Sequence, residues 1–259
     1  MKEDSLDYKR KKSFFEKLLT IYGRKAVLEA MQDEQLKIYK LHMADSNKSG
    51  GIISEITALA EQRNVETLWH DRKALSRISR NSKQDQGVAA DIELKQHLSL
   101  DEFLLQTNEN KPFKLIALDR ITNPQNLGLI IRSACAGNVD GILLPKKGCS
   151  SLSPLVIKAS VGTIFKATII HCEELPQALR TIKEKIPSSQ ICTLSSHAQE
   201  SLFSEKTDIS PFIYVLGNET DGVSREITSM SDKQLSIPMN NGVESLNVAI
   251  TAALIAFNS

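Results

Sequence analysis

The chain has 259 residues, of which 41% are hydrophobic and 24% are charged, and its formal net charge is +1. This composition is typical of a globular protein with one large domain or two ordinary ones. No apolar run is long enough to span a bilayer, so no membrane partner is expected, and the small net charge excludes a global basic field for nucleic acid. The opening residues include acidic side chains and no apolar core, unlike a secretory signal, so the expected location is cytoplasmic.

The cysteines and histidines are spaced too irregularly for a metal site. None of the four cysteines belongs to a C-x-x-C pair, and the five histidines show no i, i+4 spacing. We therefore expect no metal, no disulfide framework, and free, mostly buried thiols. The cysteines are Cys135, Cys149, Cys172 and Cys192.

The first part of the chain predicts a basic extension followed by a small α/β domain. Residues 1–20 contain Lys9-Arg10-Lys11-Lys12 and predict a basic N-terminal extension, either a solvated tail or a short helix that contacts phosphate. Residues 21–96 mix helical and strand periodicities. Helices are expected near residues 22–31, 53–61 and 71–79, and strands near 38–43, 65–69 and 86–90.

A change of pattern separates this domain from a larger one. The pattern weakens over residues 97–112, where a polar stretch ends in Pro112, so a linker is expected there. From residue 113 to 259, apolar strands alternate with helices, which predicts an α/β fold with a mostly parallel sheet covered on both faces. The expected elements cover residues 113–119, 126–138, 141–145, 164–170, 174–185, 191–195, 212–216, 234–237 and 246–257.

The first polar motif, Asn123-Pro124-Gln125-Asn126-Leu127-Gly128, follows a predicted buried strand and enters a helix that continues to Arg132. Ligands usually bind α/β sheets at such carboxyl ends of strands. We expect Asn126 to cap the helix, and Gly128 to leave room beside the Arg132 guanidinium one turn later. A helix N-terminus with an arginine suits a phosphate group, although a capped helix with a surface arginine explains the same residues.

The second motif is Leu216-Gly217-Asn218-Glu219, at the end of another predicted strand. Gly217 permits a tight turn and a close approach of the backbone to a ligand, and exposed amides there suit the edge of an adenine. On the alternative interpretation, Glu219 is only a carboxylate at the start of a helix.

The third motif leaves a predicted strand as Ile237-Pro238-Met239 and enters the last helix as Glu244-Ser245-Leu246-Asn247-Val248. Ser245 is expected to be the N-cap, with Asn247 in the first turn. The helix is rich in alanine, which equally suits close packing within the subunit or against a second one. The sequence contains no P-loop motif, no G-x-G-x-x-G after a strand and no G-x-S-x-G, so those nucleotide-binding and hydrolase classes are not expected.

In order and spacing, these three motifs resemble the signature motifs of the SpoU (TrmH) family of RNA 2′-O-methyltransferases, over about residues 113–259. The family belongs to the SPOUT superfamily, so the resemblance implies a SPOUT domain with a trefoil knot and S-adenosyl-L-methionine as the cofactor. It implies a catalytic centre formed by Asn126, Arg132, Glu219, Ser245 and Asn247. It implies cofactor binding by Leu216, Gly217, Asn218, Ile237, Pro238, Met239 and Leu246.

The N-terminal domain resembles the substrate-binding domain of the same family, which is similar to a ribosomal protein. The similarity rests on residues 22–30 and on Gln86-Gly87-Val88-Ala89-Ala90. It implies structured RNA as a partner, with large-subunit ribosomal RNA foremost. Asp85 stands where the family commonly has a histidine, so a role for that histidine does not carry over. The family is dimeric, which implies a homodimer in which Arg132 of one subunit serves the cofactor site of the other.

The resemblance implies methyl transfer to a ribose 2′-hydroxyl, with a guanosine of large-subunit ribosomal RNA as the leading expectation. A free arginine stays protonated, so we favour an electrostatic role for Arg132 over that of a general base. Two alternatives remain open: a transfer-RNA ribose methyltransferase, and a non-catalytic RNA-binding factor in ribosome assembly. The separate N-terminal domain weighs against the first, and the intact motif residues weigh against the second.

Overall fold

The computed structural model describes residues 18–94, 96–107, 112–196, 198–204 and 210–258, and it divides into two compact units, Met1–Lys95 and Gln96–Ser259. The predicted basic extension therefore lies outside the described residues, except for its last three residues. Those three begin strand β1 (Leu18–Tyr22), which the sequence analysis did not predict. None of the described helices is long and apolar enough to cross a membrane.

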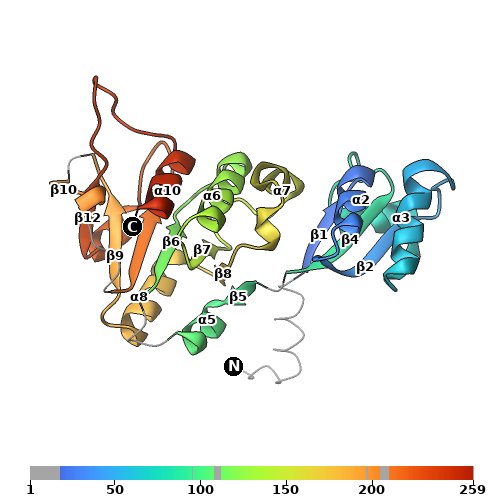
Figure 1. Cartoon of the computed structure of the whole chain (residues 1–259), viewed down its shortest axis with the longest axis horizontal. Helices are drawn as coiled ribbons and strands as arrows, with labels where there is room; N and C mark the ends of the chain where they lie inside the picture. Colours follow the sequence, from blue (N-terminus) through green and yellow to red (C-terminus); the bar gives the residue numbers. More distant parts are fainter. Residues whose placement is uncertain (1–17, 95, 108–111, 197, 205–209, 259) are drawn as a thin grey trace. The chain divides into compact units, whose positions relative to one another are not determined.

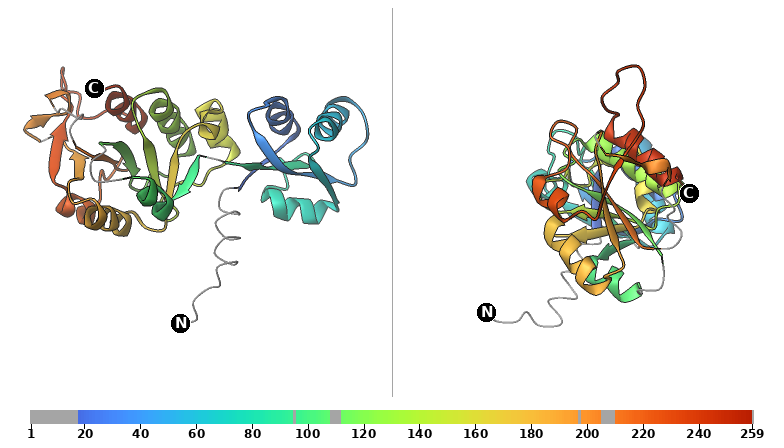
Figure 2. Two further views of the ribbon diagram at one scale, coloured as in Figure 1. Left: turned by 60° about the horizontal axis from the view of Figure 1, so that its bottom comes forward. Right: turned by 90° about the vertical axis from the view of Figure 1, so that its left-hand side faces the viewer.

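The first unit is a four-stranded sheet in the order β1-β4-β2-β3, with helices on both faces (Figure 1). Strand β4 is antiparallel to β1 and to β2, whereas β2 and β3 are parallel. Helices α2 and α3 cover one face, and α4 covers the other (Figure 2). The bounds are α2 Arg24–Gln32, β2 Lys37–Ala44, α3 Gly51–Gln62, β3 Glu66–His70, α4 Arg72–Ser79 and β4 Val88–Glu93, which confirm the predicted elements of this domain.

The second unit contains an eight-stranded sheet in the order β10-β12-β9-β11-β6-β7-β8-β5, and every pair of neighbours is parallel. The predicted, mostly parallel sheet is therefore confirmed. Its strands are β5 His97–Ser99, β6 Lys114–Leu118, β7 Gly141–Pro145, β8 Ile169–Cys172, β9 Gln190–Leu194, β10 Glu200–Ser201, β11 Phe212–Leu216 and β12 Lys233–Ser236.

Helices cover both faces of this sheet, so its central strands are buried throughout (Figure 1). Helices α6 (Pro124–Ala136), α7 (Pro154–Ser160) and α10 (Val248–Phe257) lie on one face. Helices α5 (Leu100–Gln106), α8 (Leu175–Lys185) and α9 (Arg225–Met230) lie on the other. Two short 3-10 helices, η1 Thr163–Phe165 and η2 Leu202–Ser204, complete the unit.

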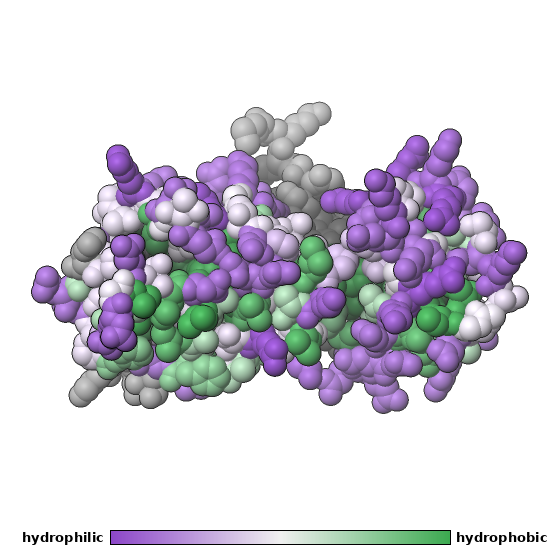
Figure 3. All heavy atoms as spheres, turned by 90° about the horizontal axis from the view of Figure 1, so that it is seen from above, coloured by the Kyte–Doolittle hydropathy of each residue, from purple (hydrophilic) through white to green (hydrophobic). Residues whose placement is uncertain are grey.

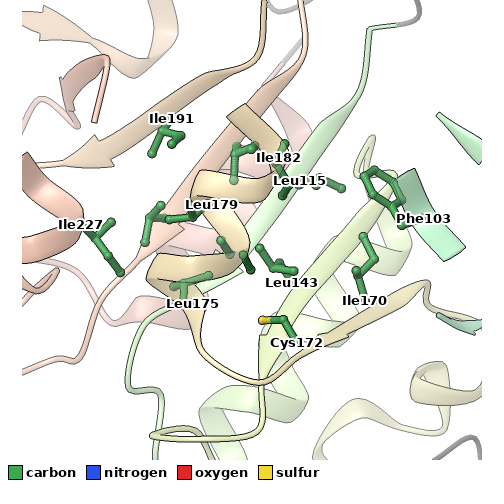
Figure 4. Close-up of a cluster of buried hydrophobic side chains, with 14 of the residues drawn as sticks. Phe103, Leu115, Leu143, Ile170, Cys172, Leu175, Leu179, Ile182, Ile191 and Ile227 are labelled. Atoms are coloured by element: carbon green, nitrogen blue, oxygen red, sulfur yellow. The ribbon is translucent and has the colours of Figure 1, made fainter. Parts of the chain in front are cut away.

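The core between the sheet and α8 shows how the apolar runs are used (Figure 4). Leu115 and Leu143 from β6 and β7 pack there with Leu179 of α8 and Ile227 of α9. Each of these side chains is fully buried, and burying a large aliphatic side chain contributes roughly 1.5–3 kcal/mol. The parallel strands read as continuous apolar runs because both of their faces are covered.

The expected linker over residues 97–112 is partly wrong, because it begins with β5 and α5 of the second unit. Ser99 caps α5: its hydroxyl accepts from the Glu102 N–H at 3.2 Å, and the Glu102 carboxylate accepts from the Ser99 N–H at 2.8 Å. Phe103 then anchors the helix in the core. The S-x-x-E signal of this capping box was present in the sequence. Segments β10, η2, α7 and α9 were also missed, since each is too short to show a periodicity.

Candidate functional site

The three motifs follow strands that belong to one parallel sheet. The first follows β6, the second follows the adjacent β11, and the third follows β12, which β9 separates from β11. Because all these strands are parallel, the loops that follow them leave the sheet at the same edge. Strand order therefore brings together segments that are far apart in the sequence.

Asn126 joins all three motifs. It lies in the first turns of α6 with 8% of its surface exposed. Its Nδ2 donates a hydrogen bond to Oε1 of Glu219, and its Oδ1 accepts one from Nδ2 of Asn247 at 3.2 Å. Both polar atoms of this buried amide are thus used, one toward each of the other two motifs.

The helix caps differ from those predicted. Asn123, not Asn126, caps α6, because its Oδ1 accepts from the N–H of Gln125 at 2.8 Å and Pro124 occupies the first helical turn. Asn247, not Ser245, caps α10, because its Oδ1 accepts from the Ala249 N–H at 2.8 Å. The side chain of Asn247 therefore caps the helix through its oxygen and binds Asn126 through its nitrogen.

The sequence predicted that Gly128 leaves room beside Arg132, and this prediction is wrong. A Cβ at Gly128 would lie 2.5 Å from the Ala159 Cβ and 2.7 Å from the Val156 carbonyl oxygen. The missing side chain instead lets α6 and α7 pack closely. The residue type was correctly singled out, but its partner is a helix that the sequence did not predict.

Arg132 and Ser245 lie outside the network around Asn126. Both side chains are exposed, and neither forms a hydrogen bond or an ion pair with another described residue. Of the five predicted catalytic residues, the structure thus joins Asn126, Glu219 and Asn247 within one subunit. It presents the other two at the surface.

The loop after β11 is held by a residue that the sequence analysis missed. The Arg120 Nη2 donates to the carbonyl oxygen of Gly222 at 3.0 Å, and the Arg120 carbonyl accepts from the Asn218 side chain at 3.2 Å. Gly217 packs closely against this same loop, since a Cβ there would lie 2.2 Å from the Gly222 carbonyl carbon. The loop holds Glu219 exposed beside Asn126. The position of Arg120 directly after a buried strand was the available signal.

The predicted cofactor residues line the same edge of the sheet. Leu216 is buried, Gly217 and Asn218 are half-buried, and Ile237, Met239 and Leu246 are half-buried around the exposed Pro238. The backbone N–H groups of Met239 and Leu246 donate to no backbone carbonyl in the described part of the chain. Segment 237–247 stands out from the body of the unit between β12 and α10 (Figure 1). Half-buried apolar side chains beside unused amides suit a ligand that has an apolar surface and hydrogen-bond acceptors.

The thiols and other titratable groups near this edge point to no other chemistry. Burial raises the pKa of the Cys149 thiol, and burial above all raises the pKa of Cys172 to about 12. Both thiols therefore stay protonated near neutral pH and are poor nucleophiles. No group of three or more His, Cys, Asp or Glu side chains among the described residues is placed to hold a metal ion.

Two family models match the chain. The model of the SpoU rRNA methylase family matches residues 113–257, which is more than half of the chain. The chain belongs to the SpoU rRNA methylase family. A second model, for RNA 2′-O ribose methyltransferase substrate binding, matches residues 20–98. The predicted membership is confirmed, and with it the enzyme class, an RNA methyltransferase of the SpoU/TrmH type.

Relatives and solved structures agree with this membership. The chain is 30% identical to the putative TrmH family tRNA/rRNA methyltransferase YacO of Bacillus subtilis, over 92% of this chain and 93% of the relative. It is 30% identical to the 23S rRNA (guanosine-2′-O-)-methyltransferase RlmB of Neisseria meningitidis, over 91% and 92%. The fold resembles that of the SpoU methyltransferase AviRb from Streptomyces viridochromogenes, solved with the cofactor AdoMet. That likeness has a TM-score of 0.66 at 19% identity and covers 96% of this chain and 92% of that one. The predicted fold class is thereby confirmed.

Proposed function

We propose that this SpoU-family protein transfers the methyl group of S-adenosyl-L-methionine to a ribose 2′-hydroxyl of RNA, with a guanosine of large-subunit ribosomal RNA as the target. The observation that carries the proposal is the network of Glu219, Asn126 and Asn247, which joins three motifs at one edge of the sheet. The name of the Neisseria meningitidis relative supports the target, and the AdoMet in the AviRb structure supports the cofactor.

The two units divide the work in this proposal. Residues 21–96 bind structured RNA, which the match to the substrate-binding model supports, and residues 113–259 carry out the transfer. The cytoplasmic location predicted from the sequence stays a prediction.

When bound, S-adenosyl-L-methionine supplies a methyl group that its sulfonium already activates, so positioning can provide much of the rate. Leu216, Met239 and Leu246 would hold the cofactor, with the amides of segment 237–247 as donors. Asn126 fixes Glu219 and Asn247 at the rim of the site. The Arg132 guanidinium stabilises the negative charge that develops on the ribose oxygen beside the RNA phosphate, as the 2′-hydroxyl loses its proton to solvent. Ser245 offers a hydroxyl from segment 237–247.

We also propose that the chain forms a homodimer through α6 and α10. Three large apolar side chains on these helices are exposed: Leu129 by 41%, Ile250 by 53% and Phe257 by 63%. Figure 3 shows apolar side chains gathered on the face that carries the two helices. Contiguous apolar surface of this kind marks protein interfaces. Arg132 lies one helical turn from Leu129, so a two-fold contact presents it to the site of the partner subunit.

The proposal is tested by incubating the pure protein with radiolabelled S-adenosyl-L-methionine and separated, unmodified ribosomal and transfer RNAs. The whole proposal is supported if large-subunit RNA becomes labelled and one of its phosphodiester linkages becomes resistant to alkaline hydrolysis. Label only in transfer RNA keeps the chemistry and overturns the target. Cofactor binding without label in naked RNA directs the test to partly assembled ribosomal subunits. A protein that does not bind the cofactor is the non-catalytic factor of the alternative interpretation.

A further inference from the structure

Helix α4 and the turn that follows it carry an unusual concentration of positive charge. Residues 72–84 contain five cationic side chains and no acidic one. All five are exposed, and none forms an ion pair with another described residue. They are Arg72, Lys73, Arg77, Arg80 and Lys83.

This concentration is local, because the unit as a whole is neutral. Residues 18–94 contain 11 Lys and Arg against 11 Asp and Glu, so nearly half of the cations gather in one short segment. Two cations elsewhere in the unit are paired: Lys37 lies 2.6 Å from the Glu93 carboxylate, and Lys40 lies 3.1 Å from that of Glu66. Two further exposed lysines, Lys25 and Lys48, also form no ion pair with a described residue, but they lie apart in the sequence, so α4 and its turn hold the densest group of unpaired cations in residues 18–94.

The geometry of α4 places two of the cations on one face, and a third follows at the C-cap. Leu75 and Ser79 are buried against the sheet, and Leu75 packs with Ala44 and Ala89. Lys73 and Arg77 have the spacing i, i+4, so they lie one turn apart on the opposite face, with Cβ atoms about 5–6 Å apart. Arg80 follows as the left-handed C-cap of the helix, with φ 53°, and extends this row of cations at its end. Figure 2 shows α4, drawn in teal, on the face of the sheet opposite α2 and α3.

Helix stability does not account for this row. Cations near a helix C-terminus interact favourably with the helix dipole, which suits Arg77 and Arg80. Arg72 and Lys73, however, occupy the first turn, where positive charge opposes the dipole. The Asp71 carboxylate at the N-cap attracts Lys73 and Arg77 and offsets part of this cost, and an external anion would stabilise the remaining positive charge.

Polar contacts at both ends of α4 hold the helix in place. Asp71 caps α4 by accepting from the Ala74 N–H at 2.8 Å. At the other end, Asp85 is 1% exposed and accepts from the Ser79 hydroxyl at 3.0 Å and from the Gly87 N–H at 2.9 Å. Asp85 thus fixes the turn that follows the basic helix. The backbone that carries the charges is thereby fixed, so it loses no further entropy when an anion binds.

We propose that the outer face of α4, formed by Lys73, Arg77 and Arg80 with Arg72 and Lys83 at its ends, binds the phosphate backbone of the RNA substrate. This inference rests on the proposed function. Contacts to backbone phosphates position the RNA on the protein. Reaction chemistry stays in the second unit.

The test compares two variants that each lose three positive charges. The first is Lys73→Gln/Arg77→Gln/Arg80→Gln, and the second is a control with three exposed lysines off α4: Lys37→Gln/Lys166→Gln/Lys185→Gln. Methylation of ribosomal RNA is measured against RNA concentration at several salt concentrations. Cofactor binding by calorimetry and the fluorescence of Trp69, the single tryptophan, check that both units remain folded.

For the α4 variant we expect the KM for RNA to rise on the order of tenfold at about 0.15 M salt, with kcat at saturating RNA retained. The dependence of log KM on log salt should become shallower by about 2–3. A charge-conserving variant, Lys73→Arg/Arg77→Lys/Arg80→Lys, should keep the parent KM. An unchanged KM in the α4 variant, or an equal rise in the control, would overturn the inference. If the unsubstituted protein itself methylated no RNA, that result would instead count against the proposed function.

Discussion

Asn247, at the start of α10, donates a hydrogen bond to Asn126 of α6 at 3.2 Å, although 121 residues separate them. Asn126 in turn donates to Glu219, so a single buried amide holds the loop after β11 and the start of α10. A half-satisfied buried amide is costly, which makes the three side chains interdependent. The site is therefore as sensitive to the fold of the unit as to the identity of its residues.

Replacing Asn126 should disable the site more than it destabilises the protein. Asn126→Ala removes both hydrogen bonds and leaves Glu219 and Asn247 without this partner, so we expect methylation to fall by about 100-fold or more. The free energy of unfolding should fall by about 1–3 kcal/mol. Initial rates and urea unfolding measure the two effects. Ser133→Ala, on the same helix, is the control, and full activity of Asn126→Ala would remove this network from the proposal.

Arg132→Ala should abolish methylation with little loss of stability. The side chain is exposed and has no partner among the described residues, so the stability change should stay within about 0.5 kcal/mol. Arg132→Lys keeps the charge and should retain part of the rate. If Arg132 serves the partner's site, mixing Arg132→Ala with Asn247→Ala subunits should restore about a quarter of the parent activity, through heterodimers with one intact site. No recovery in freely exchanging mixtures would place Arg132 in its own subunit's site.

Charge at the exposed apolar face should prevent dimer formation. Ile250→Asp places a carboxylate on α10, where the side chain is 53% exposed, and should shift the protein to a monomer in sedimentation experiments. Leu105→Asp is the matched control, because Leu105 is 87% exposed on α5, which covers the opposite face of the sheet. A dimer that tolerates Ile250→Asp but not Leu105→Asp would assign the interface to the other face.

The second unit should lose stability as the pH falls below about 6.5. Burial, and next the neighbouring His171, lowers the pKa of His97 to about 3, whereas an unfolded imidazole titrates near 6.5. Between these values the unfolded chain binds a proton that the folded chain does not, so this group costs about 1.4 kcal/mol per pH unit on acidification. Urea unfolding at several pH values, followed by circular dichroism because Trp69 lies in the first unit, should show a flatter pH dependence for His97→Phe. An unchanged slope in that variant would contradict the assignment.

A side chain at Gly128 should force α6 and α7 apart. The Cβ of Gly128→Ala would lie 2.5 Å from that of Ala159, so we expect a loss of about 1–3 kcal/mol in the free energy of unfolding. Combining it with Ala159→Gly should recover part of the loss, which urea unfolding measures. Recovery would be incomplete, because the Val156 carbonyl oxygen also lies within 2.7 Å of the added atom. If Gly128→Ala left the free energy of unfolding unchanged, the two helices would have to be able to move apart without cost.

Much of the local structure was determined by the sequence alone. The predicted strands 141–145 and 212–216 coincide with β7 and β11, because a short apolar run bounded by turn residues is readable without knowledge of its neighbours. Three motifs, each at the end of a strand, were also sufficient to predict the family, which the match over residues 113–257 confirms.

Only the tertiary structure decided what the motif residues contact. Asn126 was expected to cap a helix and instead binds Glu219 and Asn247, whereas Arg120 was overlooked although it holds the loop after β11. These contacts join segments about a hundred residues apart, and they depend on the order of strands in the sheet. Periodicity and capping signals report the conformation of neighbouring residues along the chain, so they contain no information about which strands lie side by side.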